Sequence, residues 1–200
     1  MATALHQARF HAVIRELLAD GARHVADLGC GRGELLQRLR EHRQFTRLIG
    51  VDTDIRALTR ARMVLGIDLL RPDPDLHVCL HSFTDAMWPI PRVDAGVMLE
   101  TIEHVDPGHL PQVEQAVFGR LRPRILVMTT PNREYNRLHG LSPGQRRRPD
   151  HRFEWTRSQF QQWCTGVAKR QRYRVRFAGI GPSHPAFGSS SQLARFSIAA

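Results

Sequence analysis

Two carboxylates and an imidazole stand close together near the middle of the chain, at Glu100, Glu103 and His104. On a helical turn, positions i, i+3 and i+4 share a face, so these three side chains can converge. Oxygen and nitrogen donors together favour Mg²⁺ or Mn²⁺, and the nitrogen shifts the preference toward Mn²⁺. The same residues could instead form the solvated acidic start of a helix, where the helix dipole favours glutamate. Taken alone, the pattern leaves both interpretations equally open.

A glycine-rich turn, 27–33, follows an apolar strand pattern at 24–28 and precedes a helical pattern. Glycines allow the backbone to approach a ligand closely. Asp52 ends the next apolar strand pattern, about 20 residues further on, where a carboxylate can accept both hydroxyl groups of a ribose. A turn that only tightens the packing of a strand against a helix is the alternative, and the spaced Asp27 and Asp52 favour a cofactor site.

The spacing D-x-G-x-G-x-G of this turn resembles motif I of the Rossmann-like S-adenosylmethionine-dependent methyltransferases. This resemblance implies S-adenosylmethionine as the cofactor and an acidic residue after the second strand as its ribose ligand. It also implies that an acidic residue after the third strand lies near the adenine. The cofactor-binding residues predicted in this way are Asp27, Gly29, Gly31, Asp52 and Asp85.

Short apolar segments alternate with helical patterns along most of the chain. Strands are expected near 24–28, 48–52, 76–82, 93–99 and 124–129, and helices near 5–18, 53–66, 111–121 and from 156 onward, with a further helix after the glycine turn that carries Leu35, Leu36 and Leu39. This alternation predicts a parallel sheet with both faces covered. Two alternating segments, 173–180 and 192–198, predict an antiparallel pair at the sheet edge. The segment 131–150 has no periodicity, and because no linker divides the chain, residues 1–200 are expected to form a single domain.

The chain is strongly basic, with 29 Lys+Arg against 19 Asp+Glu and a net charge of +10. Such an excess attracts polyanions, and arginine suits phosphate, so a nucleic acid is the favoured partner. No apolar run approaches the ~20 residues of a membrane span, which excludes an integral membrane protein. The three widely spaced cysteines, Cys30, Cys79 and Cys164, indicate thiols in a reducing compartment, and we expect a cytoplasmic protein.

Three segments, in this order, closely resemble the signatures of the HEN-type small-RNA 2′-O-methyltransferases. The segment 100–104 matches E-x-x-E-H, 130–136 matches T-P-N-x-E-Y/F-N, and 150–157 matches D-H-x-F-E-W-T-R. The resemblance extends over essentially the whole chain, and the eight-residue segment is its most specific part. One departure is Arg148, which stands where bacterial members often carry a histidine.

The resemblance implies an α/β Rossmann-like methyltransferase fold, with a mostly parallel seven-stranded sheet, an antiparallel edge strand and helices on both faces. It implies that the catalytic residues Glu100, Glu103, His104 and His151 bind one divalent ion, Mg²⁺ or Mn²⁺. The implied activity is methyl transfer from S-adenosylmethionine to the 2′-hydroxyl of the 3′-terminal nucleotide of RNA, whose 2′ and 3′ hydroxyls chelate the ion. An RNA-repair or RNA-processing protein is an expected further partner.

The RNA strand is expected to run over the aperiodic segment. The residues predicted to contact RNA are Asn132, Arg133, Tyr135, Asn136, Arg146, Arg147 and Arg148. The alternative for the arginine run is a solvated face. Two other functions stay open: a methyltransferase acting on a small molecule or a protein, and a non-catalytic protein that binds RNA 3′ ends.

Overall fold

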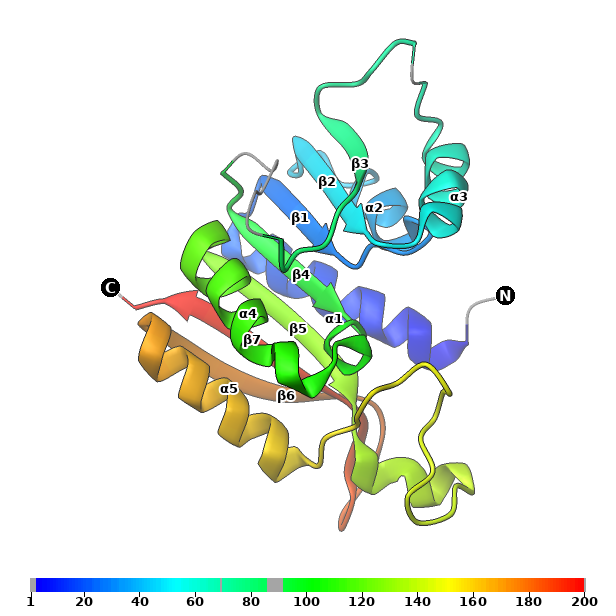
Figure 1. Ribbon diagram of the computed structural model, residues 1–200, viewed down its shortest axis with the longest axis vertical. Helices are drawn as coiled ribbons and strands as arrows, with labels where there is room; N and C mark the ends of the chain where they lie inside the picture. The colour runs from blue at the N-terminus through cyan, green and yellow to red at the C-terminus, as the bar shows by residue number, and fades with distance from the viewer. Residues whose placement is uncertain (1–2, 69, 86–91, 200) are drawn as a thin grey trace.

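Seven strands form one sheet in the order β3-β2-β1-β4-β5-β7-β6 in the computed structural model, which describes residues 3–68, 70–85 and 92–199 (Figure 1). The strands are β1 (His24–Leu28), β2 (Arg47–Asp52), β3 (Leu76–Leu80), β4 (Ala95–Leu99), β5 (Ile125–Pro131), β6 (Tyr173–His184) and β7 (Gly188–Ile198). Strands β1 to β5 pair in parallel. The α/β fold with a mostly parallel seven-stranded sheet is therefore confirmed.

The last two strands form the expected antiparallel pair at one side of the sheet. They are joined directly, as an antiparallel pair can be, and β7 pairs antiparallel with both β5 and β6. The antiparallel strand β7 therefore lies one position in from the edge, and β6 is the edge strand. The predicted edge pair is confirmed, with the hairpin turning back between β5 and the outermost strand.

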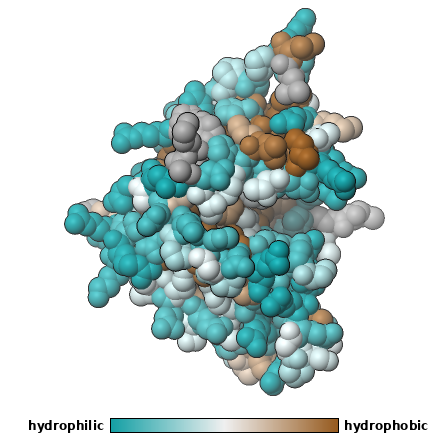
Figure 2. Space-filling model, in the orientation of Figure 1, coloured by the Kyte–Doolittle hydropathy of each residue, from teal (hydrophilic) through white to brown (hydrophobic). Residues whose placement is uncertain are grey.

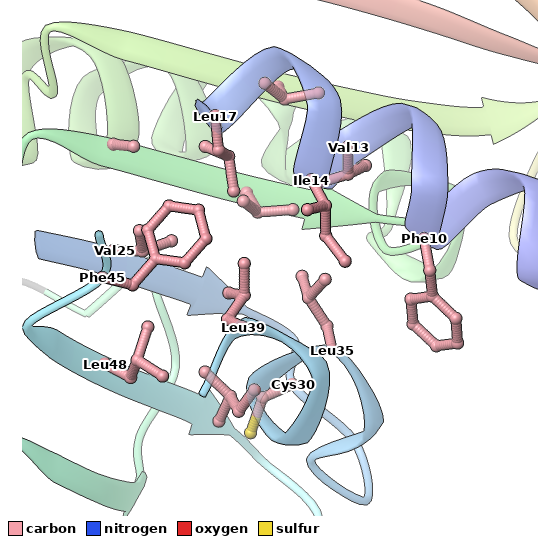
Figure 3. Packing of buried hydrophobic residues seen from close by; sticks show 14 of the residues in the cluster. Phe10, Val13, Ile14, Leu17, Val25, Cys30, Leu35, Leu39, Phe45 and Leu48 are labelled. Carbon is pink, nitrogen blue, oxygen red and sulfur yellow. The ribbon is translucent and has the colours of Figure 1, made fainter. Parts of the chain in front are cut away.

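Helices cover both faces of the sheet. One hydrophobic cluster includes residues of α1 (Ala4–Asp20), α2 (Glu34–Leu39) and α3 (Ile55–Leu65), and a second includes residues of α4 (Leu110–Val113), the π-helix η3 (Glu114–Leu121) and α5 (Arg157–Gln171). Figure 3 shows the first cluster, where Val13, Ile14 and Leu17 of α1 point toward Leu35 and Leu39 of α2. Because apolar side chains leave water on both faces, the central strands β1, β2, β4 and β5 are almost fully buried.

Two predicted segments differ in detail from the structure. The helix expected at 111–121 begins as α4 and continues as a π-helix that ends at Arg122, whose φ is 44°. The aperiodic segment contains a 3-10 helix, η4 (Arg133–His139), which Asn132 caps by accepting from the Glu134 amide. Farther along, Thr156 and Gln159 form a capping box at the start of α5. Two more 3-10 turns, η1 (Ile102–His104) and η2 (Pro107–His109), follow β4.

The carboxyl ends of the parallel strands meet at one side of the molecule, where open α/β sheets bind their ligands. In Figure 1 this side also carries the start of α1, α3 and the loop after η4. Among the described residues, no helix is long and apolar enough to cross a bilayer. The three cysteines are unpaired, with Cys30 and Cys164 buried and Cys79 half-buried.

Candidate active site

A cavity of about 650 Å³ opens at the ends of β1 and β4. Most of its walls come from the start of α1, the glycine turn after β1, the segment after β4 and the loop before α5, and Pro131 of β5 and His139 of η4 add to them. Predicted site residues on these walls are Asp27, Gly29, Gly31, Glu100, Glu103, His104, Arg147, Arg148 and His151. The predicted cofactor loop and the predicted metal ligands therefore line one cavity.

The glycine turn has the backbone conformation that only glycine adopts readily. Gly29, Gly31 and Gly33 have φ values of 89°, 52° and 77°, in the region that a Cβ disfavours. The Asp52 carboxylate accepts hydrogen bonds from the Gly31 amide at 2.8 Å and from the Asp54 amide at 2.9 Å. Asp52 therefore fixes the turn that must approach the cofactor.

Asp27 is a buried carboxyl group, with 2% of its surface exposed. Its Oδ1 has no hydrogen-bond partner among the described residues. Burial, together with the nearby charge of Asp52, raises the pKa of Asp27 to about 7. A buried carboxyl without a donor is costly, so this group is suited to accept a donor or a positive charge from a bound ligand.

Asp85 lies apart from these residues. It is exposed and outside the cavity lining, and its carboxylate accepts from the Ser82 amide and contacts the His81 ring. Its backbone carbonyl accepts from Arg120 at 2.8 Å. The structure thus brings Asp27, Gly29 and Gly31 to the cavity with Asp52 behind them, whereas the predicted adenine contact of Asp85 stays a prediction.

Three of the four predicted metal ligands form a compact cluster. One ligand atom each of Glu103, His104 and His151 lies within 4.8 Å of the others. The η1 turn carries Glu103 and His104, and the amide of Arg152 donates to the Glu103 carbonyl at 2.7 Å. This backbone bond brings the His151 segment, 48 positions away in sequence, against the turn.

Each member of this cluster is held by a protein partner through one atom. Glu103 Oε2 accepts from the Thr130 hydroxyl at 3.0 Å, and His104 Nδ1 lies 3.3 Å from the Asp150 carbonyl. His151 Nδ1 lies 2.6 Å from Glu154 Oε1. Glu103 Oε1 is buried and has no partner among the described residues. A carboxylate or carbonyl behind a histidine is the usual support of a metal ligand, because it orients the ring and fixes its tautomer.

Glu100, the fourth predicted ligand, is arranged differently. Its φ of 52° places it outside the helical turn, so the expected helical convergence with Glu103 and His104 is not formed. Its Oε2 lies 2.6 Å from the guanidinium of Arg9, and its Oε1 is buried without a partner among the described residues. Arg9 is itself held by the Ser191 hydroxyl, to which it donates at 2.9 Å. Oε2 of Glu100 is therefore held by Arg9, whereas Oε1 has no partner among the described residues.

The pKa shifts of the carboxylates and of His104 also suit the binding of a cation at the cluster. Burial raises the pKa of Glu100 and raises that of Glu103 strongly, and the charge of Glu100 adds to the effect on Glu103. Burial lowers the pKa of His104, which favours the neutral, ligating imidazole. Glu100 has Arg9 as a cationic partner and Glu103 is paired with none among the described residues, so a further cation would favour the ionised form of both carboxylates. Oxygen with nitrogen donors suits Mg²⁺ or Mn²⁺. The residues present therefore fit a divalent metal ion.

Comparison with known proteins places these features in a family. A family model described as a methyltransferase domain matches residues 25–124. The small RNA 2′-O-methyltransferase of Arabidopsis thaliana is 30% identical over 96% of this chain, and that of Mus musculus is 37% identical over 78%. The solved methyltransferase domain of bacterial CtHen1-C is 37% identical, with a TM-score of 0.87 over 98% of this chain and 100% of that chain. The chain belongs to the methyltransferase-domain family of the small-RNA 2′-O-methyltransferases.

This methyltransferase domain spans only part of the curated relatives, 22% of the Arabidopsis protein and 41% of the mouse protein. A chain in the solved Pnkp1/Rnl/Hen1 RNA repair complex also matches, at 23% identity and a TM-score of 0.70 over 98% of this chain and 42% of that chain. That likeness shows a shared fold.

In this methyltransferase domain, several residues predicted to contact RNA are buried in a polar network. Arg147 donates to Asn136 Oδ1 at 2.6 Å and to the Asn132 carbonyl at 2.7 Å. Asn136 in turn donates to Glu154 at 2.6 Å, and Tyr135 is buried beside it. Asn132 and Asn136 are buried and Arg147 is half-buried at the cavity, so this network shapes the wall behind His151.

The remaining predicted RNA contacts lie nearer the surface. Arg133 is exposed on η4. Arg146 donates to the His151 carbonyl at 2.9 Å, and Arg148 pairs with Asp150 at 3.1 Å. Of the arginine run, Arg147 and Arg148 line the cavity. Their contact with RNA stays a prediction.

Three supporting residues were not predicted: Glu154, Thr130 and Arg9. Glu154 accepts from Arg147 N, from Asn136 and from His151, and these hydrogen bonds outweigh its burial and lower its pKa. It is therefore an anionic support for His151. The i, i+3 spacing of a histidine and a glutamate was the available sequence signal, whereas nothing in the sequence relates Arg9 to Glu100.

Proposed function

We propose that this domain transfers a methyl group from S-adenosylmethionine to the 2′-hydroxyl of the 3′-terminal nucleotide of RNA. One observation carries the proposal: the glycine turn with Asp27 lines the same cavity as Glu100, Glu103, His104 and His151. A methyl donor on the turn would thus face a ribose held at the cluster. The net charge of +10 and the family membership favour RNA over a small molecule or a protein.

Glu100, Glu103, His104 and His151 would hold a divalent ion, Mg²⁺ or Mn²⁺. When bound, such an ion would coordinate the 2′ and 3′ hydroxyls of the terminal ribose and lower the pKa of the 2′-hydroxyl. This geometry would restrict the reaction to RNA ends that carry both hydroxyls.

The protein residues provide binding and orientation. Asp27 would accept a donor or a positive charge from the cofactor, and Asp52 would hold the glycine turn against it. Glu154 and Thr130 would keep His151 and Glu103 in the orientation that ligation needs. A histidine engaged through both ring nitrogens has no atom left to act as a base, so we assign proton removal to neither His104 nor His151.

The test is methylation of synthetic RNA oligomers with labelled S-adenosylmethionine, followed by mapping of the modified nucleotide. The proposal predicts a label on the terminal 2′-oxygen of RNA with a 3′-hydroxyl end and no label after EDTA treatment. A 2′-deoxy end cannot be methylated there, and a 3′-deoxy end should be a much poorer substrate. Equal methylation of a 3′-phosphorylated end would refute chelation of both hydroxyls, and turnover of only small molecules or proteins would refute RNA as the substrate.

Residues 1–200 would act as one methyltransferase domain. An RNA-repair or RNA-processing protein stays a proposed partner, because the match to a chain of an RNA repair complex concerns the fold. A cytoplasmic location stays a prediction that rests on the three unpaired cysteines. Binding of RNA ends without catalysis is the second candidate, and the same turnover assay distinguishes it.

A further inference from the structure

A second, larger hollow of about 1370 Å³ adjoins the active-site cavity. It lies along the start of α1, the α2 helix and the second half of α3. Five residues line both spaces: His6, Arg9, Arg32, Glu34 and Arg148. We call the whole of this hollow, including the end lined by the shared residues, the helix groove. It is therefore continuous with the cavity that contains the predicted metal ligands.

The helix groove is basic along its length. Arg9, Arg32 and Arg148 line the end that it shares with the active site, and Arg38 and Arg60 lie farther along it. Two acidic side chains, Glu34 and Glu41, also line it, and Glu34 lies 2.9 Å from His6 Nε2. Arg9 and Arg148 are paired with Glu100 and Asp150 outside the groove, whereas Arg32, Arg38 and Arg60 have no salt-bridge partner among the described residues. These three guanidinium groups suit a polyanion, because arginine binds phosphate oxygens in a planar fork.

The far end of the groove adds apolar surface. Met63 is 78% exposed and Val64 is 47% exposed, and both line the groove from α3. On the face seen in Figure 2, most of the surface is hydrophilic and an apolar patch lies near β3, so exposed apolar side chains are few and local. Large exposed apolar side chains beside cations suit a single-stranded nucleic acid, whose phosphates and base faces need both kinds of contact.

The other surface hollow close to the site is a weaker candidate for the same role. It lies between η4 and the following loop, measures about 500 Å³, and shares only Leu141 with the active-site cavity. It carries Arg133 and Arg137, but continuity with the site is what a strand entering the cavity requires. Continuity therefore favours the helix groove.

We propose that the helix groove binds the single-stranded RNA segment that precedes the methylated nucleotide, with Arg38 and Arg60 as phosphate contacts. This rests on the proposed function, since it assumes an RNA end at the metal ligands. The strand would leave the cavity past Arg9, Arg32 and Arg148 and continue between α2 and α3. The groove would then determine how much the nucleotides before the terminal one contribute to affinity.

The test compares the affinity of the full chain for a dinucleotide and for an oligomer of about ten nucleotides, a length within the usual site sizes. The variant is Arg38→Gln with Arg60→Gln. The matched control is Arg174→Gln with Arg176→Gln, which removes the same charge from exposed positions on the edge strand β6. The measured quantity is the ratio of the two affinities for each protein, followed as salt is raised.

The proposal predicts that the groove variant loses most of the gain from the longer RNA, and that its salt slope falls by about 1.4 for two lost phosphate contacts. The control variant should keep both the affinity gain from the longer RNA and the salt slope of the wild type. Because Arg38 stacks over Phe10 at 4.6 Å, a second variant, Arg60→Glu alone, changes an exposed position without that contact. An unchanged length gain in both groove variants, or an equal loss in the control, would refute the groove. If the proposed function itself is wrong, no RNA end is methylated at any length, and that outcome is distinct from an unchanged length gain in the groove variants.

Discussion

Replacing Asp27 with asparagine should change the pH dependence of stability in a defined way. The carboxyl is buried, one oxygen has no partner among the described residues, and the pKa is raised from 3.8 to about 7. Below pH 3.8 the group is protonated in both the folded and the unfolded chain. Between that pH and about 7 only the unfolded chain releases the proton, so the free energy of unfolding falls as pH rises.

The magnitude follows from the size of the shift. Each pKa unit corresponds to about 1.4 kcal/mol, so this group destabilises the protein above pH 7 by about 4 kcal/mol. Because asparagine does not titrate, any free-energy cost of burying its amide is the same at every pH. Relative to the variant, the wild type should therefore lose about 2–3 kcal/mol between pH 5 and pH 7.5.

Urea unfolding of both proteins, without cofactor, at several pH values measures this difference. Asp94→Asn is the matched control, because hydrogen bonds from the Arg23 and His24 amides outweigh burial and lower the pKa of Asp94. The stability that Asp94 contributes is lost only as pH falls below the ordinary range of aspartate, so its difference from wild type should be flat from pH 5 to 7.5. A flat difference for Asp27→Asn as well would refute the assignment of a buried, uncompensated carboxyl.

The remaining predictions concern the two halves of the site. His151→Ala should raise the Mn²⁺ needed for half-maximal activity by at least about tenfold and leave calorimetric cofactor affinity without metal near wild type; a parallel loss of both would indicate a packing role. Glu154→Gln should weaken Mn²⁺ binding by about 10–100-fold, because an amide cannot replace the anionic acceptor 2.6 Å from His151 Nδ1. Asp52→Ala should weaken cofactor binding by about 1.5–3 kcal/mol, since the carboxylate both anchors the Gly31 amide and would accept the ribose hydroxyls; unchanged calorimetric affinity in a folded variant would remove Asp52 from the site.

Much of the fold could be predicted because its signals are local. Short apolar runs, the glycine turn and the Thr156–Gln159 capping box each specify their own backbone. The position of β7 could not be predicted, because either strand of a hairpin can pair with β5 and only the register of the folded sheet decides between them. The π-helix at 114–121 likewise depends on packing across the chain, and its sequence reads as an ordinary amphipathic helix.

The structure brings three of the four predicted ligands together, whereas the residues that support them could not be predicted. The spacing of Glu103 and His104 and the distant His151 correspond to one cluster in the structure. Glu100 departs because its positive φ turns it away from the helical face, toward an arginine 91 positions earlier in sequence. Arg147 reads as a surface cation within an arginine run, yet its neighbours Asn132 and Asn136 give it buried acceptors. Such contacts arise only when distant segments fold together.

The cofactor turn and the segment that carries the predicted metal ligands lie close together at Gly29, and this proximity gives a second reason for glycine at this position. A Cβ at Gly29 would lie 2.5 Å from Thr101 Cγ2 and 2.8 Å from its hydroxyl oxygen, in a backbone conformation with a φ of +89°. Thr101 joins Glu100 to the η1 turn that carries Glu103 and His104. Any side chain at position 29 would therefore force Thr101 to move, even before a cofactor is bound. The absence of a Cβ at this position is therefore required by Thr101, in the segment of the predicted ligands, as well as by the positive φ of the cofactor turn.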